Sequence, residues 1–252
     1  MDEQELALRR TQMGRTTKPW IDHAGPDALW GLDDGGWLFM SGAPSSAVNL
    51  ALVHDGDPAT LAKTRGRVQE AGFPTVLMLA GSSEHADPGY GWERVGSMPF
   101  MASRLSGDHL KPDSRVRTAG PADRDAAREL IGDAFELEPE IAEVCSRVAG
   151  EDAGTLRVWL LEEGERPVSA VVTGIAGDAV CVWCMATPAR FARRGYGRAL
   201  LAHVLLAARE EGAAIGLLAA TPAGRPLYEA TGWATLEDWK MFERTDSATT
   251  HA

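Results

Sequence analysis

The chain has 252 residues, of which 44% are hydrophobic, and its 36 acidic side chains outnumber the 25 basic ones, which gives a formal net charge of −11. This composition is ordinary for a folded protein and excludes a disordered or fibrous chain. The length predicts one large domain or two modest ones. Because acidic residues exceed basic ones in both halves, neither half is expected to bind the phosphate backbone of a nucleic acid.

The sequence contains no signal for a membrane or for secretion. No apolar run approaches the roughly 18 residues that span a bilayer. The first ten residues, MDEQELALRR, lack the basic start and apolar core of a signal peptide. We therefore expect a cytoplasmic protein with no membrane partner. The three cysteines, Cys145, Cys181 and Cys184, are too few for a disulfide framework.

Hydrophobic periodicity and turn residues predict a mixed α/β chain in two parts, with the turn-rich stretch 106–114 as the linker. The predicted elements are, in chain order, a partly helical lead-in (1–18), a helix (58–71), strands (75–80 and 96–102), a strand (115–119), two helices (121–135 and 139–148), a strand hairpin (155–161 and 167–173), a strand (178–186), a helix (197–211), a strand (215–220), a helix (222–230) and a last strand region (233–244). This order combines a hairpin meander with a strand–helix–strand crossover.

The two parts resemble each other. Residues 70–80 align with residues 210–220 at a constant offset of 140, and each block joins the end of a helix to a buried strand. An internal duplication is the simplest explanation, and chance similarity of two strand–helix units is the alternative. The copies differ where the helix begins, since the second reads RRGYG over 193–197 and the first reads HDGDP over 54–58. Acidic residues at that position would repel a phosphate.

The segment that follows the strand over 178–186 predicts an anion site. Thr187 leads into a basic turn, and Gly195 and Gly197 open a long helix. Unpaired N–H groups and the dipole at a helix start favour an anion, and glycine lets the backbone approach it. A P-loop would need Gly-Lys-Ser/Thr, which is absent, and a Rossmann turn fits poorly because Leu200 occupies the third glycine position. We therefore interpret this turn as a pyrophosphate site.

The same segment resembles motif A of the GNAT superfamily of N-acetyltransferases, which reads Gln/Arg-x-x-Gly-x-Gly/Ala before a helix. Ala192 stands where the family has Gln or Arg, and Arg193 and Arg194 supply positive charge beside it. Residues 221–233, TPAGRPLYEATGW, resemble motif B in keeping the Leu-Tyr and Gly-aromatic pairs, with Thr221 in place of Asn. Both motifs at this spacing are a strong resemblance.

The resemblance implies a GNAT-like fold of the α/β class, with a mixed central sheet flanked by helices. It further implies a degenerate, truncated GNAT-like domain over residues 1–108 and a catalytic acetyltransferase domain over residues 113–245. The implied reaction moves an acetyl group from acetyl-CoA, as co-substrate, to an amine of a small molecule or peptide in a direct ternary complex, without a metal. The acceptor and the oligomeric state, a homodimer included, are left open.

The implied roles can be assigned to residues. Backbone N–H groups over 193–198 would hold the pyrophosphate, and the end of the strand over 178–186 would contact the pantetheine arm. A backbone N–H near Met185 or Ala186 would polarise the thioester carbonyl, and Tyr228 would protonate the departing thiolate. A packing role is the alternative for Tyr228. The predicted cofactor-binding residues are Met185, Ala186, Thr187, Arg193, Arg194, Gly195, Tyr196, Gly197, Arg198 and Thr221.

Several other signals have ordinary structural explanations. Cys181 and Cys184 have C-x-x-C spacing, but residues three apart on a strand face opposite sides, so no metal or redox pair is expected from them. Three glutamates could line an acceptor pocket, although a solvated helix start explains them better. Three tryptophans are expected to fill a core, with an acceptor pocket as the alternative. These residues are Glu136, Glu138 and Glu140, and Trp20, Trp30 and Trp37.

Two other functions are compatible with the sequence. The first is a non-catalytic acyl-CoA-binding or scaffold protein, which the departures at Ala192 and Thr221 favour. The second is a nucleotide-dependent oxidoreductase, which would bind NAD(P). Thiol release from acetyl-CoA with a panel of amines separates both from an acetyltransferase.

Overall fold

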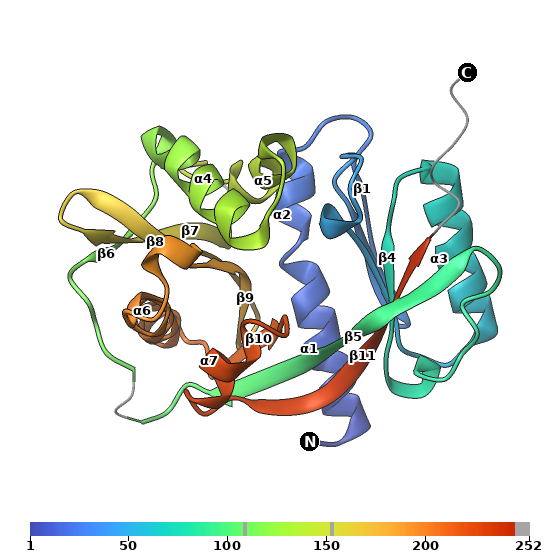
Figure 1. The fold of residues 1–252 in the computed structure, drawn as a ribbon. Helices are drawn as coiled ribbons and strands as arrows, with labels where there is room; N and C mark the ends of the chain where they lie inside the picture. The colour runs from blue at the N-terminus through green and yellow to red at the C-terminus, as the bar shows by residue number, and fades with distance from the viewer. Residues whose placement is uncertain (108–109, 152–153, 245–252) are drawn as a thin grey trace. The chain divides into compact units, whose positions relative to one another are not determined.

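A computed structural model describes residues 1–107, 110–151 and 154–244 (Figure 1). The chain divides into two compact units, unit 1 with Met1–Phe100 and Thr235–Ala252, and unit 2 with Met101–Ala234. The division therefore differs from the predicted boundaries in two places: it falls inside a strand and not in the stretch 106–114, and the last strand of the chain belongs to unit 1. Among the described residues, no helix is long and apolar enough to cross a membrane.

Unit 1 has a mixed sheet in the order β1-β2-β3-β4-β11-β5. Strands β3 and β4 are parallel and are joined by helix α3, whereas the pairs β1–β2, β2–β3 and β4–β11 are antiparallel. The elements are α1 (Glu3–Arg15), α2 (Lys18–Asp22), β1 (Leu29–Asp33), β2 (Gly36–Met40), η1 (Ser46–Val48), β3 (Asn49–Val53), α3 (Pro58–Ala71), β4 (Val76–Leu79), η2 (Gly81–Ser83), the first part of β5 (Trp92–Arg104) and β11 (Ala234–Arg244).

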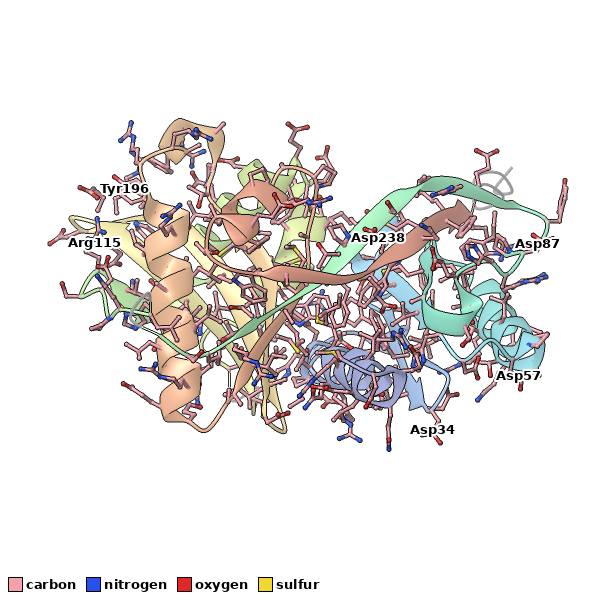
Figure 2. The ribbon with its side chains drawn as sticks, turned by 90° about the horizontal axis from the view of Figure 1, so that it is seen from below. Asp34, Asp57, Asp87, Arg115, Tyr196 and Asp238 are labelled. Carbon is pink, nitrogen blue, oxygen red and sulfur yellow. The ribbon has the colours of Figure 1, made fainter. Side chains whose placement is uncertain are left out.

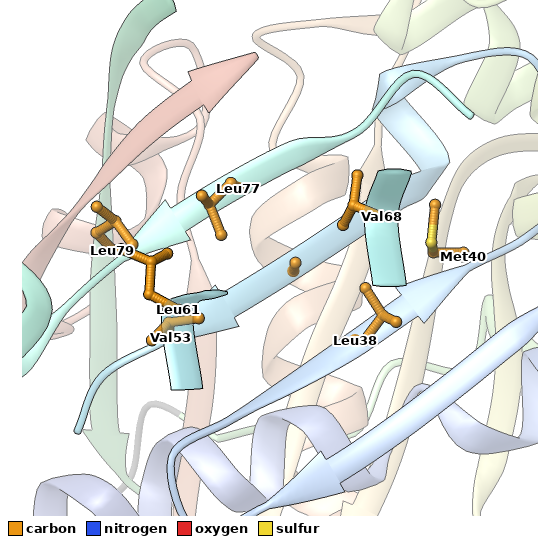
Figure 3. Close-up of a cluster of buried hydrophobic side chains, with 8 residues drawn as sticks. Leu38, Met40, Val53, Leu61, Val68, Leu77 and Leu79 are labelled. Atoms are coloured by element: carbon orange, nitrogen blue, oxygen red, sulfur yellow. The ribbon is translucent and has the colours of Figure 1, made fainter. Parts of the chain in front are cut away.

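The core of unit 1 lies between α3 and strands β2 to β4 (Figure 3). Helix α3 has the predicted bounds, since the Asp57 carboxylate accepts the N–H of Ala59 and Gly72 ends the helix with φ +74°. The buried side chains of this cluster are Leu38, Met40, Ala51, Val53, Leu61, Val68, Leu77 and Leu79. They alternate along each strand, as expected when one face of a sheet meets a helix.

Strand β11 completes unit 1, whereas the prediction placed its residues in the domain 113–245. Its Trp239 is 1% exposed and stacks on Phe100 with ring centroids 4.6 Å apart. Trp37 meets the same indole edge-on at 6.4 Å. A hydrophobic strand pattern does not reveal which sheet the strand joins, because the pairing partner, here β4, is remote in sequence.

The lead-in over 1–18 contributes more than predicted. Helix α1 begins at Asp2, whose carboxylate accepts the Glu5 N–H, and it buries Met13 and the whole side chain of Arg10. Trp20 and Trp37 are buried, so the prediction that these tryptophans fill a core is confirmed for both.

Unit 2 has a mixed sheet in the order β10-β9-β8-β7-β6, with the end of β5 next to β10. Helices α4 and α5 lie on one face of this sheet and α6 lies on the other (Figure 1). The elements are β6 (Val116–Thr118), η3 (Pro121–Asp123), α4 (Arg124–Phe135), α5 (Pro139–Ser146), β7 (Leu156–Glu163), β8 (Arg166–Ala176), β9 (Ala179–Ala186), η4 (Ala189–Phe191), α6 (Tyr196–Glu210), β10 (Ile215–Ala219) and α7 (Arg225–Glu229).

The predicted elements of unit 2 are all present, with ends that shift by a few residues. The amphipathic pattern of α6 is confirmed: the predicted apolar face, Leu200, Leu201, Val204, Leu205 and Ala208, is buried. Strands β9 and β10 are parallel and are joined by α6, which repeats the β3–α3–β4 arrangement of unit 1. The crossover places the start of α6 at the carboxyl end of β9, where ligands of open α/β sheets bind.

Candidate functional site

The parallel strands β9 and β10 separate at their carboxyl ends. They pair at Ala179–Ile215, Val180–Gly216 and Cys181–Leu217. Beyond these positions, β9 continues to Ala186 and β10 to Ala219, but within the described residues the two strands no longer pair with each other. Backbone groups that face such a separation can bind an extended, amide-containing ligand.

A β-bulge interrupts β9 over the stretch in which it separates from β10. Val172 pairs with Trp183 and Ala170 with Ala186, so Cys184 and Met185 together lie opposite one residue of β8. Cys184 has φ +47°, a conformation that is rare outside glycine and is typical of a bulge that redirects a strand. The end of the bulged strand is fixed by Ser169, whose hydroxyl donates a 2.8 Å hydrogen bond to the Ala186 carbonyl.

The turn before α6 has the geometry of an anion site. Gly195, with φ +83°, is the N-cap, and no side chain caps the first N–H groups of α6 among the described residues. The first turn contains no acidic residue. Because the N-terminal N–H groups of a helix carry partial positive charge, an uncapped start with exposed arginines favours an anion. The exposed arginines are Arg193, Arg194 and Arg198.

Two predicted residues of this turn have separate roles. The ring of Tyr196 is buried, and the Arg115 guanidinium lies 5.8 Å from its centroid (Figure 2), so only the Tyr196 backbone can serve the anion site. Arg190 is paired with Glu129 and Asp133 of α4 and is engaged in that contact. Arg190, which belongs to η4, is therefore held against α4, whereas Arg193, Arg194 and Arg198 are exposed near the turn.

The start of α6 lies directly against the end of β9. A Cβ atom at Gly197 would come 3.3 Å from the Thr187 hydroxyl and 3.5 Å from Met185 Cε. The Thr187 hydroxyl is also 2.8 Å from the hydroxyl of Ser169. The structure therefore brings together Met185, Thr187 and Gly197, as the sequence predicted, and adds Ser169.

A cavity of about 700 Å³ opens beside the first half of α6. Its apolar wall includes Leu205 and Trp233, and Lys111 and Arg198 are its basic lining residues. The cavity also reaches Gly195, so it is continuous with the anion site. Asp113 also lines the cavity and is paired with Arg115, so an apolar slot with two basic side chains suits a flat heterocycle that carries phosphate.

Tyr228 is carried by α7 and is 6% exposed. Burial, followed by the nearby Cys184 thiol, raises the pKa of the Tyr228 phenol well above its usual value. The phenol therefore stays protonated at neutral pH and can donate a hydrogen bond or a proton. The described residues give its hydroxyl no hydrogen-bond partner, although the ring packs edge-on against Trp233 at 5.7 Å.

Thr221 is engaged locally. Its hydroxyl accepts the N–H of Gly224 at 3.1 Å, which closes the turn before α7. The hydroxyl proton remains available to donate, but the amide that the family has at this position could bond to a ligand from both ends. This departure from motif B thus reduces the hydrogen bonds that Thr221 can offer.

The predicted glutamates lie apart from the anion site. Glu136 and Glu138 line a second, open cavity of about 830 Å³ between α4 and α5, and Glu140 is in the first turn of α5. Within the described residues, no group of three or more His, Cys, Asp or Glu side chains could hold a metal ion. No local pattern in the sequence indicated Ser169 or the bulge, because both depend on pairing between strands.

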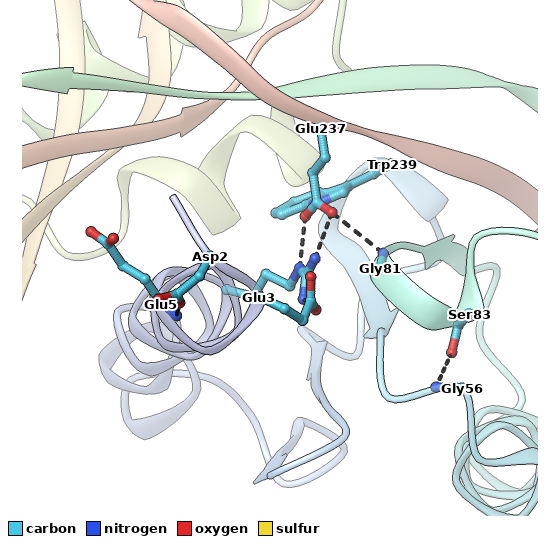
Figure 4. Close-up of polar contacts among 9 residues, drawn as sticks. Asp2, Glu3, Glu5, Gly56, Gly81, Ser83, Glu237 and Trp239 are labelled. Carbon is cyan, nitrogen blue, oxygen red and sulfur yellow. Dashed lines mark hydrogen bonds and ion pairs between the residues drawn. The ribbon is translucent and has the colours of Figure 1, made fainter.

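The corresponding place in unit 1 is closed. Strands β3 and β4 stay bonded to their ends, where Ala80 N–H donates to the Val53 carbonyl at 3.0 Å. The N–H of Gly56 donates to the Ser83 hydroxyl at 2.9 Å (Figure 4), and the first turn of α3 is capped by Asp57. These groups, which in unit 2 are free at the start of α6, have intramolecular partners in unit 1.

Comparisons with known proteins agree with this geometry. The acetyltransferase (GNAT) domain family matches residues 154–235. No curated protein sequence matches the chain. A GCN5-related N-acetyltransferase from Kribbella flavida is similar in structure, with a TM-score of 0.61 and 17% identity over 92% of this chain and 95% of that one.

Two further solved structures have the same fold. One, from Novosphingobium aromaticivorans and described as an acetyltransferase of the GNAT family, has a TM-score of 0.63 and 16% identity over 94% of this chain and 97% of that one. The other is a tandem GNAT protein from the clavulanic acid biosynthesis pathway, with a TM-score of 0.51 and 14% identity over 94% of this chain and 96% of that one. The family domain supports acyl transfer as the general activity. The family match covers residues 154–235, and the solved structures show that the chain shares the fold of GNAT proteins.

Proposed function

We propose that unit 2 transfers an acetyl group from acetyl-CoA to an amine in a direct ternary complex. The observation that carries the proposal is that β9 and β10 separate near the start of α6, where no side chain caps the helix among the described residues. An extended pantetheine arm fits between the strands, and its pyrophosphate fits at the start of α6. The cavity beside Arg198 then takes the adenosine.

The chemical step uses groups of the bulge and of α7. The amine, in its neutral form, attacks the thioester carbonyl, and negative charge develops on the carbonyl oxygen. Met185 is the better of the two predicted oxyanion donors, because it lies in the bulge, whereas Ala186 has returned to register with Ala170. As the tetrahedral intermediate collapses, the C–S bond breaks and Tyr228 gives its proton to the departing thiolate. Water accepts the proton released by the amine.

Unit 1 is proposed to be a degenerate copy that does not bind acetyl-CoA. Its crossover has the same order as that of unit 2, but its strands remain paired and its helix start is capped. A tandem arrangement with one functional site follows from this contrast.

Calorimetry and a thiol-release assay test the proposal together. We expect one acetyl-CoA to bind per chain, and thiol release to depend on at least one member of a panel of small amines, amino acids and peptides. Absence of acetyl-CoA binding would refute the proposal. Binding without turnover on any amine would instead support a non-catalytic acyl-CoA-binding protein, which the local engagement of Thr221 favours.

A further inference from the structure

Two hydroxyl groups meet where strand β8 lies beside the end of β9. Ser169 lies on β8 and is fully buried, and Thr187 is the first residue after β9. Their hydroxyl oxygens are 2.8 Å apart, and the Ser169 hydroxyl is also 2.8 Å from the carbonyl oxygen of Ala186. Ser169 therefore contacts both the last residue of β9 and the residue that begins the turn toward α6.

The direction of these two hydrogen bonds follows from the number of protons available. A carbonyl oxygen cannot donate, so the single proton of the Ser169 hydroxyl goes to Ala186. The contact between the hydroxyls then needs the proton of Thr187, which Thr187 donates to the Ser169 oxygen. Thr187 has no further hydroxyl proton for a ligand, so it offers a ligand lone pairs alone and acts as an acceptor.

The Thr187 hydroxyl lies where a ligand of the anion site would pass. Thr187 is partly exposed and directly follows the stretch of β9 that no longer pairs with β10. A Cβ atom at Gly197 would come 3.3 Å from the hydroxyl oxygen, so the oxygen lies against the start of α6. Glycine at this position leaves that side of the hydroxyl uncovered, whereas a larger residue would cover it.

An acceptor at this place distinguishes between the parts of acetyl-CoA. An ionised pyrophosphate has acceptor oxygens and no donor, so it gains nothing from a second acceptor and is repelled by it. Each amide of the pantetheine arm, by contrast, has an N–H that can donate a hydrogen bond. The orientation of the Thr187 hydroxyl therefore suits the arm and disfavours the pyrophosphate.

We propose that Ser169 is a positioning residue that fixes the Thr187 hydroxyl as an acceptor for an amide N–H of the pantetheine arm. The identity of the ligand rests on the proposed function, whereas the bond between the two hydroxyls is independent of any ligand. The sequence predicted Thr187 as a cofactor-binding residue without indicating which part of the cofactor it binds. The hydroxyl pair assigns Thr187 to the arm and leaves the phosphates to the helix start and its arginines.

The variant Thr187→Val tests the contact with the ligand, because valine keeps the shape of threonine and has no hydroxyl. Calorimetry measures the Kd of acetyl-CoA and of S-acetylpantetheine, which has the arm without the pyrophosphate. We expect the affinity for both to fall by about fivefold, as for loss of one neutral hydrogen bond, with the salt dependence of the wild type. Weaker binding of acetyl-CoA alone would assign the hydroxyl to a phosphate and overturn the proposal, as would unchanged binding of both.

The variant Ser169→Ala, alone and combined with Thr187→Val, tests whether Ser169 acts through Thr187. By itself it should weaken acetyl-CoA binding by about threefold, because the Thr187 hydroxyl is then free to rotate. In the Thr187→Val background the same change should alter the affinity by less than about 1.5-fold. Equal losses in the two backgrounds would mean that Ser169 acts independently of Thr187 and would overturn the positioning role.

The variant Thr173→Val is the matched control. Thr173 lies on the same strand as Ser169 and is buried, and its hydroxyl accepts the indole N–H of Trp159 at 2.8 Å. The variant removes a buried hydroxyl from β8 and keeps the bond between Ser169 and Thr187. We expect it to lose stability and to bind acetyl-CoA as the wild type does. A loss of affinity equal to that of Ser169→Ala would overturn the positioning role.

Denaturant titrations of the same variants separate this inference from the proposed function. The losses of stability in Ser169→Ala and Thr187→Val should be less than additive, because each removes the same hydrogen bond, and additive losses would overturn that bond. If the wild type binds acetyl-CoA without turnover on any amine, acetyl transfer fails while the affinities still decide the role of Thr187. If it binds no acetyl-CoA, the assignment of Thr187 to the arm is overturned together with the proposed function, and the stabilities still decide the hydroxyl bond.

Discussion

At the scale of single residues, the chemistry proposed for unit 2 uses a tyrosine whose environment the sequence did not show. The sequence placed Tyr228 on a short helix, and the Leu-Tyr pair of motif B suggested its role. Burial and the neighbouring thiol, which hold the pKa of its phenol above the usual value, come from β9 and from the packing of α7. Both effects keep the phenol in the form that a general acid needs.

The variant Tyr228→Phe tests this role. It removes the acidic proton and keeps the ring contact with Trp233, so we expect kcat to fall by about 100-fold or more and the Kd of acetyl-CoA to stay within about twofold. Because the pKa of the phenol is raised, the wild-type rate should not decline through loss of the acid up to about pH 10. Thiol-release assays over a pH series measure kcat and its dependence on pH. An unchanged kcat in the variant would remove the assignment.

In unit 1, a buried ion pair is the corresponding residue-scale feature (Figure 4). Arg10, fully buried, donates two hydrogen bonds to the Glu237 carboxylate, at 2.7 and 2.6 Å. Burial by itself would raise the pKa of Glu237, but the hydrogen bonds from Arg10 and Trp239 bring it below the usual value. The ionised pair therefore joins α1 to β11.

The variant Glu237→Gln should destabilise unit 1 by about 1–3 kcal/mol, because it removes the charge from the carboxylate that accepts two hydrogen bonds from buried Arg10 and leaves the exposed Glu3 as its charged partner. A carboxyl group with a lowered pKa contributes its stability above the pKa of the unfolded state and loses it as the pH falls through the folded value. The difference between wild type and variant should therefore be full at pH 7 and shrink below about pH 4. Denaturant titrations over a pH series measure it, and a constant difference would contradict the pKa shift.

At the scale of elements, the same β–α–β unit occurs twice with different ends. In unit 2 the strands separate and α6 begins uncapped, whereas in unit 1 they stay paired and α3 is capped. The sequence predicted this contrast from the residues before each helix, RRGYG against HDGDP. The separation of the strands was not predictable, because it depends on the bulge in β9 and on its contacts with β8.

The two ends of α6 provide a matched pair of variants. Arg198 lies in the first turn and lines the cavity, whereas Arg209 is an exposed arginine of the last turn. We expect Arg198→Ala to weaken acetyl-CoA binding by about tenfold, as for loss of one charged hydrogen bond, and to make binding less dependent on salt. Arg209→Ala should bind as the wild type does. Calorimetry at two salt concentrations measures the affinity of each variant for acetyl-CoA. An equal loss of affinity in both variants would argue against a phosphate site at the start of α6.

At the scale of the whole molecule, the chain passes through unit 1 twice. The chain builds unit 1, then unit 2, and returns to unit 1 with β11. Unit 1 is therefore formed by two segments of the chain. The predicted domain 1–108 lacks β11, and the predicted domain 113–245 includes it. The central strand β11 cannot be removed without exposing the core around Trp239 and Phe100.

Deletion of residues 235–252 tests this division. Loss of a buried tryptophan alone costs about 3–5 kcal/mol, so loss of the whole strand should unfold unit 1 at room temperature. Hydrogen exchange with peptide resolution should show the amides of β3 and β4 unprotected in the shortened chain. Deletion of residues 245–252 alone is the control, because it keeps β11 whole. Full protection after the larger deletion would contradict the observed division.

The sequence by itself determined the elements, the motifs and the charge at the start of α6, because each depends on residues close together in the chain. Helix α6 and the Arg-Arg-Gly-Tyr-Gly turn were therefore predictable in position. The tertiary structure alone decided the sheet that β11 joins and the bulge at Cys184. These features arise from contacts between segments far apart in sequence, and a local pattern of hydrophobic and polar residues carries no information about which distant segment it will meet.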